Sequence, residues 1–183
     1  MSHLLVTNDF PPKVGGIQSY LWELWHRLPA EEVTVLAAAH RDAAAFDAAQ
    51  PYRVVRARQP VLLPTPGLVG RVNALARDVA ASVVVLDPAL PLGLVGPRLE
   101  LPYAVVLHGA EVTVPGRLPG ARAALASVLA GAAHLVAAGG YPADEARRAA
   151  GRRPLPPVTV VPPGVDGERF RPLAADERAK ARA

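Results

Sequence analysis

The chain has 183 residues, 51% of them apolar, with a net charge of +4 and no cysteine. This length and composition suit one folded domain and exclude a disordered chain, disulfides, thiolate zinc sites and a cysteine nucleophile. No apolar run reaches the roughly 18 residues that a membrane-spanning helix needs, and the start of the chain lacks the pattern of a secretion signal. Only two of the 20 basic residues are lysines, Lys13 and Lys180, as is typical of a GC-rich genome such as that of an actinobacterium. The positive charge therefore indicates either an anionic partner or only a codon-biased surface.

Apolar runs of strand type alternate with helical patterns along the chain. In chain order, we expect strands at 3–7, 32–38, 52–57, 82–87, 102–109, 134–139 and 158–162. We expect helices at 16–28, 67–81, 119–133 and 141–150. Because strands covered on both faces read as nearly continuous Val, Leu, Ile and Ala runs, the alternation predicts an α/β fold with a doubly wound, Rossmann-like parallel sheet. Residues 1–162 would form this domain, and residues 163–183 a connection that leads out of it.

The first expected helix has an apolar stripe made of Ile17, Leu21, Leu24 and Leu28. Trp25 lies off this stripe. An apolar stripe along one side of a helix indicates that this side packs on the sheet.

The loop "NDFPPKVGG" joins the first expected strand to this helix. In an open parallel sheet, ligands bind outside the carboxyl ends of the strands. Gly15 and Gly16 open the helix, where free N–H groups and the helix dipole favour an anion such as a phosphate. The spacing is neither that of a dinucleotide fingerprint nor that of a P-loop. A simple tight turn is an equal alternative.

The segment "VVLHGAEVTVPGR" places His108 at the carboxyl end of a buried strand, directly before Gly109. A histidine in this position can donate to a ligand hydroxyl or phosphate, and the alternative is a histidine bonded to its own loop. The other histidines show no metal-ligand spacing. No Gly-x-Ser-x-Gly elbow is present, which argues against a serine hydrolase.

Three segments, "TNDFPPKVGGIQSYLWEL", "VVLHGAEVTVPGR" and "VTVVPPGVDGERFRP", carry a resemblance through their order and separations. The chain resembles, from residue 3 to about residue 173, the N-terminal half of the retaining glycosyltransferases of family 4, which have the two-domain GT-B fold. Within that family it is most similar to the actinobacterial subgroup that adds mannose to phosphatidylinositol mannosides, and "AAGGYPADEARRA" also fits that subgroup.

The resemblance implies transfer of mannose from GDP-mannose with retention of configuration, without a cofactor, a metal or an enzymic nucleophile. Attack would come from the face that the phosphate leaves, and the leaving phosphate would help to deprotonate the acceptor. The implied site residues fall into three groups: Gly15, Gly16 and Lys13 at the donor diphosphate, Asp9 and Gln18 on the acceptor side, and His108 as the catalytic residue at the transferred sugar. Gln18 would reach the inositol ring of the acceptor, and Asp9 and Lys13 would shape the loop.

Arginines flank the apolar run "PVLLPTPGLVG" on both sides: Arg53, Arg56, Arg58, Arg71 and Arg77. Arginines beside an amphipathic helix can hold anionic headgroups. We therefore expect Arg56, Arg58 and Arg71 to bind the anionic phospholipid acceptor, in a cytoplasmic protein that is peripheral on the inner face of the membrane. An ordinary solvated helix face is the alternative. Nucleic acid is not expected as a partner.

A GT-B enzyme has a second domain that supplies most of the nucleotide-sugar pocket. The resemblance therefore implies a C-terminal donor-binding domain as the missing partner of this chain, which alone would be inactive. Two alternatives stay open at this point. One is another family 4 hexosyltransferase with a different donor or acceptor, and the other is a non-catalytic α/β module that binds a phosphorylated ligand or a partner chain.

Overall fold

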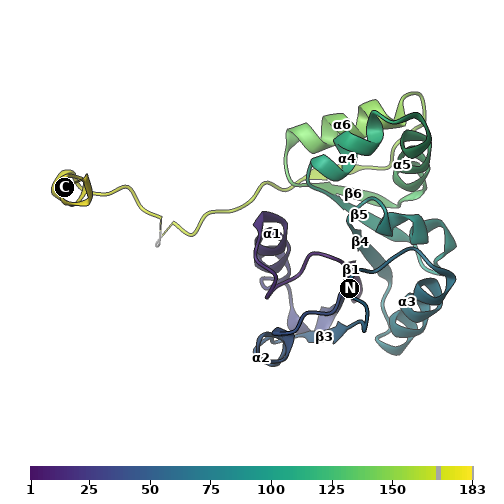
Figure 1. Ribbon diagram of the computed structural model, residues 1–183, viewed down its shortest axis with the longest axis horizontal. Helices are drawn as coiled ribbons and strands as arrows, with labels where there is room; N and C mark the ends of the chain where they lie inside the picture. Colours follow the sequence, from purple (N-terminus) through teal and green to yellow (C-terminus); the bar gives the residue numbers. More distant parts are fainter. Residues whose placement is uncertain (168–169, 183) are drawn as a thin grey trace.

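The computed structural model describes residues 1–167 and 170–182. Its body is one seven-stranded sheet in which every pair of neighbouring strands is parallel (Figure 1). The strands are β1 His3–Thr7, β2 Val33–Ala37, β3 Arg53–Arg56, β4 Val83–Asp87, β5 Tyr103–Leu107, β6 His134–Ala137 and β7 Val158–Val160. The predicted doubly wound parallel sheet is confirmed. The first strand has the predicted bounds, and each of the other six was predicted one or two residues too long at one or both ends.

The helices are α1 Gly16–Trp25, α2 Ala43–Ala48, α3 Pro66–Asp78, α4 Ala110–Gly116, α5 Pro119–Gly131, α6 Gly140–Ala150 and α7 Ala175–Arg182, with 3-10 turns at Ala30–Glu32 and Leu92–Arg98. The four predicted helices correspond to α1, α3, α5 and α6. The helices α2 and α4 were not predicted, because six or seven residues do not repeat an apolar pattern often enough to be recognised.

The strand order is β3-β2-β1-β4-β5-β6-β7. The direction of chain progression reverses between β1 and β4, where Thr7 and Asp87 pair in register at the ends of the two strands. Connections from these strands leave toward opposite sides, which opens a crevice at the carboxyl edge of the sheet. The fold thus places its ligand crevice beside Thr7 and Asp87.

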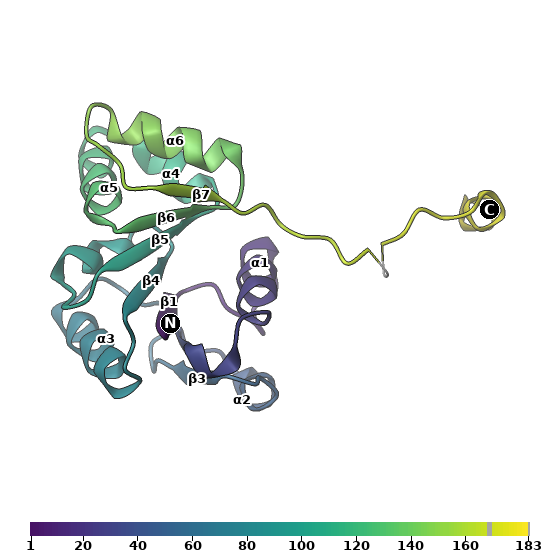
Figure 2. The same cartoon turned by 180° about the vertical axis from the view of Figure 1, so that it is seen from behind.

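Helices cover both faces of the sheet (Figures 1 and 2). The cluster that contains Leu4 and Val6 packs against α3, α4, α5 and α6, whereas the cluster that contains Leu5 packs against α1. This division follows from the two-residue period of a strand, which sends alternate side chains to opposite faces. The crevice therefore lies between α1 on one face and α4 on the other.

The first helix ends earlier than predicted. It stops at Trp25, and Leu28 is 38% exposed, whereas Trp25 is only 4% exposed. Pro29 follows Leu28 and disfavours helical backbone at the residue before it. The prediction of Leu28 on the packing stripe was therefore wrong, and Trp25 takes that place below Leu21.

After β7, residues 161–166 leave the sheet without regular secondary structure (Figure 2). The predicted connection includes positions 168, 169 and 183, which lie outside the described residues. The boundary near residue 162 stays a prediction. In the described part of the chain, none of the helices has the length and apolar character of a membrane span.

Two glycines, one packed against an aromatic ring of the sheet and one in open space, test how tightly the core is packed. A Cβ at Gly96 would lie 2.7 Å from the Tyr103 ring, whereas a Cβ at Gly70 in α3 would meet nothing within 4 Å. We expect Gly96→Ala to lower the free energy of unfolding by about 1–3 kcal/mol through overpacking. Gly70→Ala should raise it by roughly 0.5–1 kcal/mol, because alanine loses less backbone entropy than glycine in a helix. Urea denaturation followed by circular dichroism measures both, and equal effects would contradict the packing described.

Candidate functional site

A chain of buried polar groups occupies the crevice at the ends of β1, β4 and β5. Asp87 is fully buried, and its Oδ2 accepts a hydrogen bond from Thr7 Oγ1 at 2.7 Å. Its Oδ1 lies 2.8 Å from His108 Nε2. Because a buried carboxylate must find donors, Asp87 joins the ends of all three strands at one point.

The chain of polar contacts continues into the loop before α1. The Asp9 backbone N–H donates to Thr7 Oγ1 at 2.8 Å. Asp9 Oδ1 in turn accepts from Lys13 Nζ and from Gln18 Nε2, each at 2.6 Å. The structure therefore links the predicted residues Asp9, Lys13 and Gln18 to one another, and through Thr7 to the group that holds His108.

Gly15 and Gly16 begin α1 next to this network. A Cβ at Gly15 would stand 2.2 Å from Gln18 Oε1, so a side chain there would displace the Gln18 carboxamide. A Cβ at Gly16 would meet nothing within 4 Å. No side chain caps α1, and its first turn carries no acidic residue. Its first N–H groups therefore lack helical partners, and Gly16 is exposed.

On the other side of the crevice, the Glu111 carboxylate bonds to the two backbone N–H groups that precede α4. Glu111 accepts from the backbone N–H of His108 at 2.5 Å and from that of Gly109 at 3.0 and 3.1 Å. Gly109 has a φ of 154°, a conformation that favours glycine. Glu111 thus places a negative charge at the start of α4, whereas the first turn of α1 carries no acidic residue.

The His108 ring has one further contact, with an aromatic ring of α1. Tyr20 of α1 lies edge-on to it, with ring centroids 5.3 Å apart, and the Tyr20 hydroxyl donates to the Val161 carbonyl at 2.8 Å. Burial lowers the pKa of His108, but the hydrogen bond and charge of Asp87 outweigh this and raise the pKa above its ordinary value. The ring therefore bonds to a neighbouring strand and is not held by its own loop alone.

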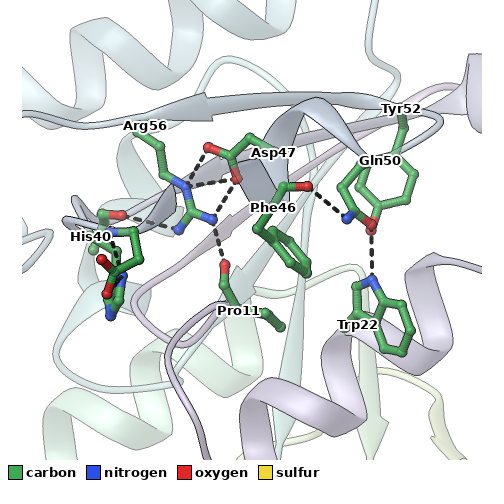
Figure 3. A network of polar contacts seen from close by, with 10 residues as sticks. Pro11, Trp22, His40, Phe46, Asp47, Gln50, Tyr52 and Arg56 are labelled. Atoms are coloured by element: carbon green, nitrogen blue, oxygen red, sulfur yellow. Dashed lines mark hydrogen bonds and ion pairs between the residues drawn. The ribbon is translucent and has the colours of Figure 1, made fainter. Parts of the chain in front are cut away.

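Arg56, the last residue of β3, belongs to the network of polar contacts in Figure 3. Its Nη2 is 2.7 Å from Asp47 Oδ1, it also donates to the carbonyls of Pro11 and Ala38, and its guanidinium lies over the Phe10 ring. The side chains of Arg56 and Asp47 are only 15% and 18% exposed. Arg56 therefore ties the first loop to the sheet and α2, and its predicted contact with an acceptor stays a prediction.

The four other arginines near the apolar run differ in their partners. Arg53 pairs with Asp78 and Arg77 pairs with Glu100, both on the surface. In the described part of the chain, Arg58 and Arg71 have no carboxylate partner, and Arg71 Nη2 donates to the Arg56 carbonyl at 2.9 Å. Arg71 also lines a pocket of about 350 Å³, to which the exposed side chains of Val61 and Leu63 contribute. These two guanidinium groups are available to an anion.

Sequence reasoning missed four residues of this site: Thr7, Tyr20, Asp87 and Glu111. One signal was present, because an apolar strand of the type "VVVLD" ends in a carboxylate at the sheet edge where ligands bind. Tyr20 and Glu111 carry no such signal, since their contacts depend on how α1 and α4 pack. In the part of the chain that the structure describes, no three His, Asp or Glu side chains are grouped to hold a metal.

Comparison with known proteins shows the family of the chain. The sequence profile of Glycosyltransferase Family 4 matches residues 14–169. The chain therefore belongs to glycosyltransferase family 4.

Two curated relatives of the chain carry the same name. A GDP-mannose-dependent alpha-(1-6)-phosphatidylinositol monomannoside mannosyltransferase of Mycobacterium tuberculosis is 40% identical over 179 residues, which cover 92% of this chain and 46% of the relative. The protein of the same name from Mycolicibacterium smegmatis is 37% identical over 98% of this chain and 48% of its own length. The chain thus spans about half the length of the curated relatives that it matches.

Solved structures support the fold. Anabaena Alr3699/HepE, solved in complex with UDP, matches with a TM-score of 0.73 at 16% identity, over 100% of this chain and 49% of that protein. Sucrose-phosphate synthase from Thermosynechococcus elongatus matches with a TM-score of 0.68 at 15% identity, over 53% of its length. The predicted fold, one half of a GT-B glycosyltransferase, is confirmed.

Arg56 and Arg58 give a matched test of which arginine supports the loop. Arg56→Gln leaves Asp47 without its partner, and we expect a loss of about 1–3 kcal/mol in the free energy of unfolding, less than for a fully buried pair. Arg58→Gln removes the same charge from an exposed position and should change stability by less than about 0.5 kcal/mol. Thermal and urea unfolding measure both variants. Equal stability of the two would contradict the supporting role of Arg56.

Proposed function

We propose that this chain is the acceptor-side half of a retaining GT-B mannosyltransferase that moves mannose from GDP-mannose to a phosphatidylinositol mannoside acceptor. The observation that carries the proposal is the 40% identity, over 92% of this chain, to a mannosyltransferase whose name states that donor and that acceptor. The crevice at the strand switch point, with one free helix terminus and one buried histidine, is consistent with it.

The donor diphosphate would lie at the start of α1, close to Gly15 and Gly16. The N–H groups of this terminus attract phosphate oxygens, and the open space beyond Gly16 lets the backbone approach them. Lys13 supports this placement because its side chain is 52% exposed and stands within the same loop. The loop would thus form one wall of the donor site.

The acceptor would contact the same loop from the side of Gln18. Asp9 holds Nε2 of Gln18 at 2.6 Å, which fixes the direction of the carboxamide and leaves Oε1 to accept from a ligand hydroxyl. Gly15 leaves room for the carboxamide itself, since a Cβ there would stand 2.2 Å from Oε1. A polyhydroxylated ring such as inositol suits this arrangement, because it supplies several donors.

The transferred sugar would lie between these two ligands, next to His108. The acceptor hydroxyl attacks the anomeric carbon from the face that the phosphate leaves. The new C–O bond forms as the bond to the phosphate oxygen breaks, and the hydroxyl proton passes to that phosphate oxygen. In this role His108 contacts the reacting centre as a hydrogen-bond donor and does not need to act as a nucleophile.

The lipid part of the acceptor would lie along the loop before α3. Among the five arginines that flank the apolar run, Arg58 and Arg71 have no carboxylate partner in the described part of the chain, and Val61 and Leu63 are 49% and 55% exposed beside them. Basic and apolar side chains together favour an anionic membrane surface. The protein would accordingly be cytoplasmic and bind peripherally to the inner face of the membrane.

The rest of the donor site would come from a second, C-terminal domain. The relatives are about twice as long as this chain, and residues 163–183 would lead toward that domain. Because the second domain supplies most of the nucleotide contacts in this kind of fold, we propose that the chain alone has little or no transferase activity.

Binding of inositol 1-phosphate by the 183-residue chain tests the acceptor assignment. We expect Gln18→Ala to weaken binding about tenfold, the loss of roughly one hydrogen bond in a partly buried site. Ser19→Ala, one residue further along α1 and exposed, should bind as the unchanged chain does. Isothermal titration calorimetry measures all three. Unchanged binding by Gln18→Ala would remove the role of Gln18, and absence of binding by the unchanged chain would contradict the acceptor-side assignment.

A further inference from the structure

Asp87 has no part in the function proposed above, yet it is the most buried charged group in the crevice. It ends β4, its side chain is 0% exposed, and each carboxylate oxygen has one side-chain partner. Thr7 donates to Oδ2, and the His108 ring is 2.8 Å from Oδ1. A carboxylate accepts and does not donate, so the proton in the second contact belongs to His108 Nε2.

The contacts of His108 leave one ring atom for a ligand. His108 Nε2 bonds to Asp87, and the His108 backbone N–H donates to Glu111. The Tyr20 ring lies edge-on to the imidazole. In the described part of the chain, Nδ1 has no hydrogen-bond partner. With the ring held at Nε2, Nδ1 is therefore the atom that can meet a ligand, and its direction is set by Asp87.

The charged groups around this ring are mostly acidic. Asp87 faces it from β4, Glu111 from α4 and Asp9 from the first loop, where Asp9 is itself paired with Lys13. Burial lowers the pKa of His108, and these carboxylates more than compensate, so that the pKa is raised. Burial also raises the pKa of Asp87, against the lowering effect of the bonds from His108 and Thr7. The pKa values of Asp87 and His108 are thus both raised, and each rise favours the protonated form of its group.

We propose that Asp87 is a positioning residue, which holds His108 through Nε2 and so presents Nδ1 to an oxygen of the glycosyl donor. An imidazole that carries protons on both nitrogens donates at Nδ1 and places positive charge where negative charge develops on the leaving phosphate. The identity of the ligand rests on the proposed function, whereas the pairing of Asp87 with His108 does not.

The contact between Asp87 and His108 also predicts how the stability of the folded chain changes with pH. A histidine whose pKa is raised on folding contributes stability that is complete below its ordinary value of 6.5 and is lost as the pH rises through the folded value. The difference in melting temperature between the unchanged chain and Asp87→Asn should therefore be largest near pH 6 and narrow toward pH 9. A difference that stayed constant over this range would indicate that Asp87 only fills space.

Long-range ¹H–¹⁵N spectra of the histidine rings test the proposal directly. In the 183-residue chain, we expect His108 to keep its Nε2 proton throughout the titration and to lose the Nδ1 proton with a midpoint above 6.5. In Asp87→Asn the midpoint should fall by about one pH unit or more, because one unit corresponds to the loss of a single close charge interaction. Asp78→Asn removes an equal charge from the exposed pair with Arg53 and should leave His108 unchanged.

Two results would overturn the proposal. One is a neutral His108 ring with its proton on Nδ1 in the unchanged chain, which needs no variant and so holds even if Asp87→Asn fails to fold. The other is an unaltered His108 midpoint in a folded Asp87→Asn chain. Neither spectrum depends on transferase chemistry. Failure of this proposal is therefore distinguishable from failure of the acceptor assignment, which inositol 1-phosphate binding tests separately.

Discussion

A carboxylate that is wholly excluded from water must be surrounded by donors, and Asp87 imposes this constraint on the centre of the molecule. The side chains that satisfy it come from the ends of two other strands, Thr7 of β1 and His108 after β5. Thr7 then anchors the Asp9 backbone, and Asp9 anchors Gln18 and Lys13. The first loop, and the helix terminus that it leads to, are thus linked through Thr7 to a single buried charge.

The crevice combines two kinds of helix terminus with opposite consequences. Before α4, Glu111 accepts from the backbone N–H of Gly109, whereas no side chain caps α1. The proposed diphosphate site at Gly16 rests on this difference. The arginines divide in a similar way, since Arg56 is used inside the fold while Arg58 and Arg71 remain without acidic partners in the described residues.

The fold was largely predictable from the sequence, because long apolar runs such as those of β4 and β5 leave few alternatives to a buried parallel sheet. The site was predictable only in part. Gly15, Gly16 and His108 carry local signals of a turn and a strand end, whereas the contact of His108 with Asp87 depends on strand order, which no local pattern contains. Arg56 illustrates the opposite difficulty. Its charge suggests a ligand contact, and only the position of Asp47 on the unpredicted α2 reveals its supporting role.

A chimera offers the most direct measurement of the central claim, that this domain presents a mannolipid acceptor to a glycosyl donor held by a second domain. Residues 1–162 of this chain would replace the corresponding half of the Mycobacterium tuberculosis relative, which is 40% identical. We expect the chimera to transfer mannose from GDP-mannose to phosphatidylinositol monomannoside. A folded chimera that binds GDP-mannose but leaves this lipid unmodified would contradict the account.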